Sequence, residues 1–139
     1  MTPANWVLDA SAALALILDD ENGADVERVI QETLQSEQTI TAPALFWFEV
    51  LNALTMAMRR HRLPIEDAHI AEVNLNLLPI ITEPAPDAFI RGRIRELAHT
   101  YELTAYDAAY LECAQRHNRF LKTYDRHLLN LRSVFPFIV

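Results

Sequence analysis

Cysteine, lysine and glycine are almost missing from this chain of 139 residues. Cys113 is the only cysteine, which excludes an internal disulfide and fits a reducing cytoplasm. The two glycines, Gly23 and Gly92, lie outside any glycine-rich loop, so the P-loop and dinucleotide-binding fingerprints are absent. Lys122 is the only lysine, and arginine therefore supplies the rest of the positive charge.

Long hydrophobic runs and a basic leader are also missing. Charges or prolines interrupt every apolar stretch before about 18 residues, so we expect no membrane span. Residues 1–5 contain none of the basic side chains that open a secretory signal. Hydrophobic residues nevertheless make up 51% of the chain, which is enough for a core. We therefore expect a cytoplasmic protein with one domain spanning residues 1–139.

The net charge of −7, from 19 acids and 12 bases, presents a conflict for one class of partner. Proteins that bind nucleic acid through bulk charge need a positive surface to contact phosphates. Either the partner is not nucleic acid, or cations bound to the acids offset the negative charge locally.

Short β-prone runs alternate with amphipathic helical runs along the chain. This alternation predicts an α/β fold with three layers, α/β/α, and a central, mostly parallel sheet of about four or five strands. The expected strands cover residues 6–8, 39–42, 79–82, 119–123 and 134–138, the last weakened by Pro136. The expected helices cover residues 10–18, 24–35, 44–60, 65–77, 86–100, 104–118 and 125–131.

Four acids fall where a parallel α/β sheet gathers its ligands, beyond the carboxyl ends of the strands. Asp9 and Asp125 directly follow expected strands, and Glu49 lies about one turn into the helix after strand 39–42. Asp107 is in the first turn of a helix that leads into strand 119–123, and the usual crossover brings it to the same edge. We therefore expect one shared acidic site.

Each acid also has a structural interpretation. Asp9 and Asp125 suit the N-caps of the helices that follow them, and the stretch Thr104–Asp107 matches a capping box with Asp in place of Glu. Glu49 is harder to explain this way, because its neighbours are apolar and a carboxylate there is costly unless it is paired or binds a cation. The joint placement favours one shared site over four independent roles.

The acids have no cationic neighbour in the sequence, since no lysine or arginine lies close to Asp9, Glu49 or Asp107. Clustered carboxylates repel one another, and a divalent cation relieves that repulsion. Hard oxygen ligands without Cys or His favour Mg²⁺ or Mn²⁺ over Zn²⁺, and the five histidines are scattered. Such a site suits metal-activated attack of water on a phosphodiester, and the metal would also offset the negative charge.

Four short stretches that contain the acids are distributed over essentially the whole chain: Val7–Ala12, Glu49–Leu54, Leu103–Tyr110 and Leu121–Leu128. They resemble the four motifs of the PIN-domain ribonucleases, most closely the VapC-type toxins of prokaryotic toxin–antitoxin pairs. The resemblance implies that the catalytic, metal-binding residues are the four acids, namely Asp9, Glu49, Asp107 and Asp125.

The same resemblance implies further features of the site and its partners. Ser11 and Thr123 match supporting hydroxyl positions, and Asn52 matches a supporting amide position. Tyr124 is bulkier than the small residue usual there, which bears on substrate geometry. A PIN-like toxin implies a parallel sheet between helices, Mg²⁺- or Mn²⁺-dependent endoribonuclease activity on RNA, a homodimer and a small antitoxin that blocks the site.

Three other functions remain open on the sequence. A receiver-like signalling domain needs an early acid pair and a late lysine, and a phosphatase with an Asp nucleophile needs a second acid where Ser11 stands. A non-catalytic PIN-like binding module would also fit, although all four acids are retained.

The remaining charged and reactive residues have structural interpretations that we favour. Arg59, Arg60 and Arg62 suit favourable charge at a helix C-terminus, with RNA contact as a second hypothesis. Arg91, Arg93 and Arg95, together with Arg116 and Arg119, are expected to form a solvated face that is also able to contact RNA or an acidic partner. Cys113 stands among apolar helix residues and is expected to be inert packing.

Overall fold

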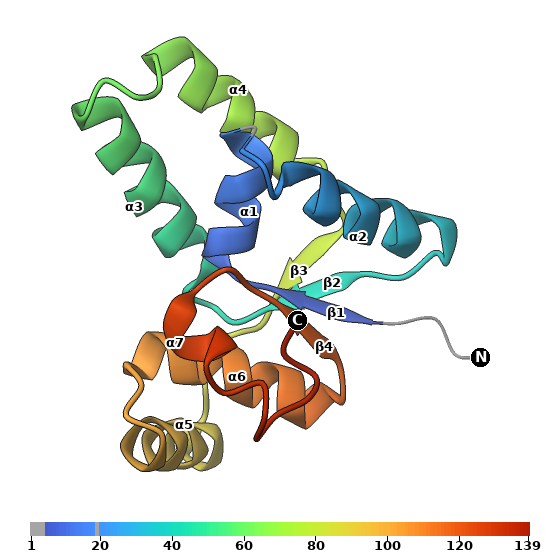
Figure 1. The fold of residues 1–139 in the computed structure, drawn as a ribbon, viewed down its shortest axis with the longest axis vertical. Helices are drawn as coiled ribbons and strands as arrows, with labels where there is room; N and C mark the ends of the chain where they lie inside the picture. The colour runs from blue at the N-terminus through green and yellow to red at the C-terminus, as the bar shows by residue number, and fades with distance from the viewer. Residues whose placement is uncertain (1–4, 19) are drawn as a thin grey trace.

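The sheet consists of four short parallel strands in the order β3-β2-β1-β4 (Figure 1). The structure is a computed structural model that describes residues 5–18 and 20–139. The strands are β1 (Trp6–Leu8), β2 (Ile40–Ala42), β3 (Ile80–Thr82) and β4 (Phe120–Lys122). Val7 of β1 is aligned with Thr41 of β2 on one side and with Leu121 of β4 on the other. The central position of β1 explains its apolar sequence, since strands of parallel sheets are covered on both faces.

Helices cover both faces of the sheet, which confirms the predicted layered α/β fold. Figure 1 shows α1 to α4 on one side, with α3 and α4 extending away from the sheet, and α5 to α7 on the other. The helices are α1 (Ala10–Ile17), α2 (Gly23–Gln35), α3 (Phe46–Arg59), α4 (Ile65–Asn76), α5 (Ala88–Thr100), α6 (Ala105–His117) and α7 (Arg126–Leu129). Among the helices that the structure describes, none combines the length and the hydrophobicity needed to cross a membrane.

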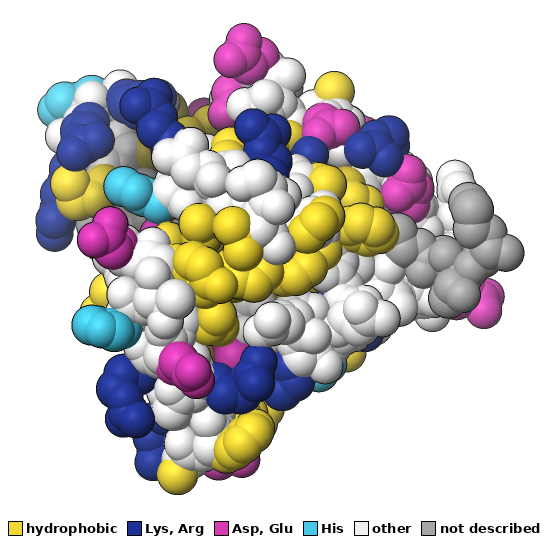
Figure 2. Space-filling view, turned by 60° about the horizontal axis from the view of Figure 1, so that its bottom comes forward, with side chains coloured by type: hydrophobic (Ala, Val, Ile, Leu, Met, Phe, Trp, Pro, Cys, Tyr) yellow, Lys and Arg dark blue, Asp and Glu magenta, His cyan; other side chains and the backbone are white. Residues whose placement is uncertain are grey.

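The surface mixes charges of both signs. Figure 2 shows hydrophobic side chains gathered near the centre of one face, with basic and acidic side chains distributed around them. This face therefore offers no broad positive surface that would offset the negative net charge. The conflict between this charge and the binding of nucleic acid remains.

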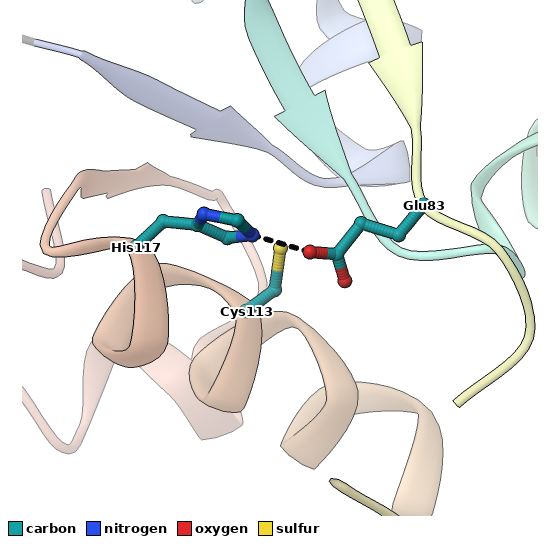
Figure 3. Close-up of side chains that lie close together, drawn as sticks. All are labelled: Glu83, Cys113 and His117. Atoms are coloured by element: carbon teal, nitrogen blue, oxygen red, sulfur yellow. Dashed lines mark hydrogen bonds and ion pairs between the residues drawn. The ribbon is translucent and has the colours of Figure 1, made fainter. Parts of the chain in front are cut away.

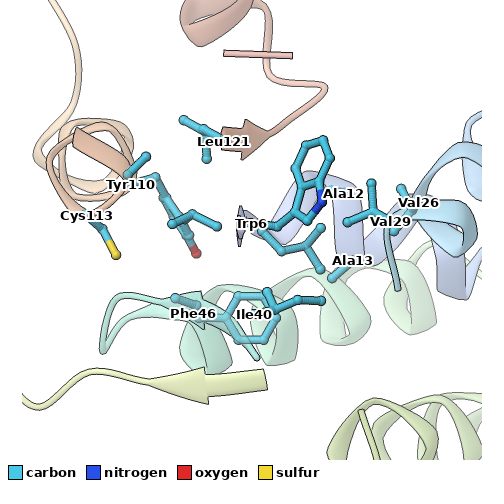
Figure 4. Close-up of a cluster of buried hydrophobic side chains, with 14 of the residues drawn as sticks. Trp6, Ala12, Ala13, Val26, Val29, Ile40, Phe46, Tyr110, Cys113 and Leu121 are labelled. Atoms are coloured by element: carbon cyan, nitrogen blue, oxygen red, sulfur yellow. The ribbon is translucent and has the colours of Figure 1, made fainter. Parts of the chain in front are cut away.

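The core lies where the two helix layers meet the sheet (Figure 4). Val26 and Val29 of α2 pack on one side, and Tyr110 and Cys113 of α6 pack on the other. Val26 and Val29 are spaced at the helical period that predicted a buried face for this segment. This two-sided packing fixes the strand ends and thereby the residues that follow them.

The strand expected at residues 134–138 does not form. The N–H of Leu121 donates to the carbonyl of Phe137 at 2.9 Å, and the N–H of Val139 donates to the carbonyl of Leu121 at 2.9 Å. Only Ile138 forms a β-bridge with Leu121, so the segment lies beside β4 without extending the sheet. The N–H of Arg119 donates to the carbonyl of Ala114 at 2.9 Å, and the N–H of Ile138 donates to that of Phe135 at 3.1 Å, so the segment turns and the pairing does not continue.

Candidate active site

Three of the predicted acids come after the carboxyl ends of strands, and Asp107 lies at the start of α6, the helix that leads into β4. Asp9 joins β1 to α1, Asp125 joins β4 to α7, and Glu49 and Asp107 lie in the first turns of α3 and α6. The negative charge of Asp125 contributes to raising the pKa values of the other three acids. Asp125 is thus close enough to interact electrostatically with each of them.

Asp9 is the most deeply buried member of this set, with an exposed fraction of 4%. Burial raises the pKa of Asp9 to about 6, although hydrogen bonds from Ser11, Thr123 and the Ala12 N–H lower it. Ser11 Oγ donates to Asp9 Oδ1 at 2.6 Å, and Thr123 Oγ1 donates to Oδ2. These donors hold the carboxylate in one orientation and compensate part of its desolvation.

Ser11 and Thr123 also connect the loops after β1 and β4. The N–H of Tyr124 donates to Ser11 Oγ at 2.9 Å, and the N–H of Asp125 donates to Thr123 Oγ1 at 3.0 Å. The two hydroxyl oxygens are 3.4 Å apart. The network therefore fixes Asp125 relative to Asp9, which is consistent with the supporting role expected for both hydroxyls.

Glu49 and Asp107 are half-buried and share a negative environment. Burial raises the pKa of Asp107 to about 6, the negative charges of Asp125 and Glu49 raise it further, and His127 lowers it. Burial also raises the pKa of Glu49, a hydrogen bond with Tyr110 lowers it, and Asp125 raises it. A group of carboxylates that raise one another's pKa values stores a repulsion that a cation would relieve.

The sequence singled out Glu49 as the acid hardest to explain without a cation, but the structure buries Asp9 more deeply than Glu49. Glu49 is half-buried at the edge of the buried face of α3. In the same turn of this helix Phe46 is fully buried, whereas Phe48 is 77% exposed. Its apolar neighbours in the sequence therefore do not all surround it in space. Asp9 is the deeply buried acid, because it follows a strand that is covered on both faces.

The capping interpretations hold alongside the shared site. Asp9 Oδ1 accepts from the N–H of Ala12 at 3.0 Å, and Asp125 Oδ1 accepts from the N–H groups of His127 and Leu128 at 2.9 and 3.3 Å. The N–H of Asp107 donates to Thr104 Oγ1 at 3.1 Å, as expected for a capping box. Capping orients the individual side chains, but it does not account for their convergence.

The other predicted site residues lie farther from the acids. Asn52 is exposed one turn after Glu49, and its supporting role stays a prediction. Arg59 follows Glu49 by ten residues on α3, which places it about 15 Å away along the helix axis. Arg60 and Arg62 lie beyond that end and are exposed. The structure does not bring these arginines to the acids, and their contact with RNA also stays a prediction.

Tyr110 is a candidate site residue that the sequence reasoning missed. Its side chain is 1% exposed, and its hydroxyl completes no hydrogen bond of standard geometry within the described part of the chain. Burial and then the negative charge of Glu49 raise the pKa of Tyr110 above its usual range. Its position one turn after Asp107, on the same face of α6, is the signal that would have identified it.

Replacing Tyr110 with Phe tests whether this phenol positions Glu49. We expect RNA cleavage to fall about tenfold and the metal affinity to weaken, because Glu49 loses a neighbouring donor. Thermal stability should change little, since the hydroxyl makes no hydrogen bond of standard geometry that the substitution would remove. Tyr101→Phe, at the end of α5, is the matched control. Unchanged cleavage and metal affinity in a folded Tyr110→Phe protein would show that the phenol only fills space.

The divalent-ion hypothesis fits the chemistry of these side chains, because carboxylate oxygens are the ligands that Mg²⁺ and Mn²⁺ prefer. No three of the four acids have ligand oxygens all within 4.8 Å of one another; over residues 5–18 and 20–139, only Glu83, Cys113 and His117 form a group that meets this criterion. The carboxylate oxygens of the acids are thus farther apart than the ligands of one bound metal ion would be.

Comparisons with known proteins agree with the interpretation of this fold, with acids at one edge of its sheet, as a PIN-like domain. The family model described as "PIN domain" matches residues 6–133. Ribonuclease VapC12 from Mycobacterium tuberculosis is 33% identical over 109 residues, which are 78% of each chain. The chain therefore belongs to the PIN-domain family.

Two solved structures show the same fold. The crystal structure of PAE2754 from Pyrobaculum aerophilum has a TM-score of 0.67 and 24% identity, and the match covers 91% of this chain and 85% of that one. A toxin–antitoxin complex from Klebsiella pneumoniae has a TM-score of 0.63 and 18% identity, covering 98% and 96%. At these identities the likeness concerns the fold.

Proposed function

We propose that the chain is a metal-dependent endoribonuclease of the VapC type, the toxin of a toxin–antitoxin pair. Asp9, Glu49, Asp107 and Asp125 are its metal ligands and catalytic residues, and Mg²⁺ or Mn²⁺ is the ion. The observation that carries the proposal is the placement of the four acids at the starts of α1, α3, α6 and α7, where the charge of Asp125 reaches the other three. Membership of the PIN-domain family and the 33% identity to a ribonuclease support RNA as the substrate.

The chain's own side chains prepare this site for a cation. Ser11 and Thr123 orient the Asp9 carboxylate through hydrogen bonds. Lys122, the only lysine, forms a partly buried ion pair with Asp25 of α2 instead of neutralising an acid of the site. A bound divalent ion supplies an activated water and stabilises the departing oxygen of the phosphodiester. The same charge allows the substrate phosphate to approach a protein of net charge −7.

Metal-dependent cleavage of RNA by the purified chain tests the proposal. We expect activity with Mg²⁺ or Mn²⁺, its loss in excess EDTA, and its loss in Asp9→Asn and Asp107→Asn, each still folded by circular dichroism. Asp67→Asn, at an exposed position of α4, provides a matched control and should be fully active. Full activity in excess EDTA, or in either site variant, would contradict the proposal.

The partner we propose is a small antitoxin with an acidic, amphipathic segment. An apolar groove of about 600 Å³ lies beside the acids, because Phe48 and Tyr106 of its lining adjoin Glu49 and Asp107 in the chain. Glu83 and Glu112 of the lining pair with Arg116, so Arg91 and Arg95, which also line this groove, favour an acidic occupant. A segment bound there would cover the acids, and the toxin–antitoxin complex of similar fold supports such a partner. Co-purification with a small protein that suppresses cleavage would test it.

The chain is also proposed to form a homodimer. Ile70, Val73 and Leu77 expose large hydrophobic side chains along α4, and Leu51 of α3 exposes another. Val73 and Leu77 line one shallow apolar hollow together with Leu51. A second copy of the chain would remove this surface from water, and light scattering of the purified protein measures the resulting mass.

The alternative functions receive less support from the contacts. A receiver-like domain uses its late lysine beside the acidic centre, whereas Lys122 contacts Asp25 and lies over the ring of Tyr124. A non-catalytic PIN-like module would bind a partner tightly and cleave no RNA, so the cleavage assay distinguishes it from the proposed enzyme.

A further inference from the structure

A second group of metal-ligand side chains lies away from the acidic site. Glu83, just after β3, and Cys113 and His117 of α6 point toward one another (Figure 3). A carboxylate oxygen, the thiol sulfur and an imidazole nitrogen of these residues all lie within 4.8 Å of one another. Cys113 and His117 are four residues apart, which puts both on one face of the helix. Segments distant in the sequence thus bring together three different ligand types.

The ligand set differs in kind from the four acids. Thiolate, imidazole and carboxylate together suit Zn²⁺, whereas Mg²⁺ and Mn²⁺ prefer oxygen ligands. A tetrahedral zinc ion bonds such atoms at about 2.0–2.3 Å, which separates them by roughly 3.3–3.6 Å. The three atoms lie within 4.8 Å of one another, so side-chain rotations would have to bring them to these separations. His117 Nε2 and Glu83 Oε1 are in contact and would have to move apart.

Arg116 is the group that competes with a cation here. Its Nη2 and Nη1 atoms donate to Glu83 at 2.6 and 2.8 Å, and its Nε donates to Glu112 Oε1 at 2.5 Å. Arg116 Nη1 also lies 3.1 Å from His117 Nε2, and Glu83 pairs with both Arg116 and His117. Glu83 is therefore held as a carboxylate facing the sulfur and the imidazole.

Charge balance favours a divalent ion in spite of Arg116. Glu112 is only 1% exposed and pairs with Arg116, which accounts for that positive charge. Glu83 and a Cys113 thiolate then contribute two further negative charges, which a divalent ion neutralises. Arg116 also orients the Glu83 carboxylate, the role that outer hydrogen-bond donors have at metal sites. His117 is exposed enough to leave an entry path from solvent.

We propose that Glu83, Cys113 and His117 form a second metal site, selective for Zn²⁺ or a similar thiophilic divalent ion. The site is separate from the acids: Cys113 and His117 follow Asp107 by six and ten residues, or about 9 and 15 Å along α6. A bound ion cross-links α6 to the end of β3, and it stabilises the fold without entering the nuclease reaction.

Cobalt(II) is the probe that tests this site, because a cobalt–thiolate bond gives a charge-transfer absorption in the near ultraviolet. The full chain is titrated with Co²⁺ and then Zn²⁺ under reducing conditions. We expect one equivalent to give the thiolate band, Zn²⁺ to displace it, and the melting temperature to rise. Asp107→Asn and His99→Gln, the latter at an exposed histidine of α5, should keep the band.

Variants of the three ligands decide the outcome. Cys113→Ser should lose the band, and His117→Gln and Glu83→Gln should weaken Co²⁺ binding at least about tenfold. Because Cys113 is buried, Cys113→Ser can destabilise the fold, but His117 is on the surface and its variant remains decisive. The proposal is overturned if the folded, reduced chain shows no thiolate band, or if His117→Gln and Glu83→Gln bind Co²⁺ as tightly as the natural chain.

Discussion

Asp125→Asn is expected to reduce metal-dependent RNA cleavage about 100-fold or more while leaving the fold intact. Asn caps a helix as well as Asp does, so the contacts of this side chain with the N–H groups of His127 and Leu128 should survive. The substitution removes only the charge, and that charge acts on Asp9, Glu49 and Asp107. Initial rates at several Mg²⁺ concentrations, together with thermal melts, measure both effects.

Asp87→Asn is the matched control for this experiment. Asp87 caps α5 by accepting from the N–H of Ile90 at 2.9 Å, so the same substitution is made in the same structural role. The control should keep full activity and stability. If Asp125→Asn cleaves RNA as fast as Asp87→Asn, the acid is only a cap, and the proposal of one four-acid site fails.

The metal-free protein is expected to lose stability as the pH rises from about 4 to about 6. The pKa of Asp9 is raised from 3.8 to about 6, so over this range the folded state keeps a proton that the unfolded state releases. The unfolding free energy therefore falls with pH across this range and levels off above it. For the deeply buried Asp9 the change is about 3 kcal/mol. Asp107 adds a smaller loss of the same sign, since its pKa is also raised to about 6.

Urea denaturation at pH 4, 5, 6 and 7.5 in EDTA measures this loss, and the difference between the natural chain and Asp9→Asn isolates it. Asp25 has the opposite sign, because its pKa is lowered to about 2 and its contribution disappears only below about pH 4. Asp9→Asn should flatten the decline, and Asp67→Asn should not. Millimolar Mg²⁺ should restore stability above pH 6 in the natural chain and in Asp67→Asn, but not in Asp9→Asn. A decline that persists unchanged in Asp9→Asn would show that Asp9 is not its source.

Much of the fold and the candidate site could be predicted, because local sequence determined it. The apolar run Trp6–Leu8 and the helical spacing of Val26 and Val29 identified a buried strand and an amphipathic helix. Strand ends then placed Asp9 and Asp125 at one edge of the sheet. The last strand was expected to be weak, and the structure reduces it to a single β-bridge at Ile138.

The parts that were missed depend on contacts between distant segments. Arg116 and Arg119 were expected on a solvated face, but Arg116 binds Glu83, and Arg119 bonds to Thr41. Cys113 is buried in the core as expected, but its position beside Glu83 and His117 depends on how α6 crosses the sheet. The exposure of Glu49 likewise depends on the direction of its side chain, at the edge between the buried and the exposed face of α3. Sequence spacing predicts neighbours along one helix, but not those across the fold.

The ion pair between Lys122 and Asp25 has a consequence for chemical labelling of the chain. Lys122 is the only lysine, and it is only 7% exposed between β4 and α2. Amine-directed reagents, acetyl donors and lysine-specific crosslinkers therefore find no accessible lysine side chain while the protein is folded. Modification of Lys122 would instead report opening of the segment that joins the sheet to α2, so this one ammonium group serves as a built-in probe of unfolding.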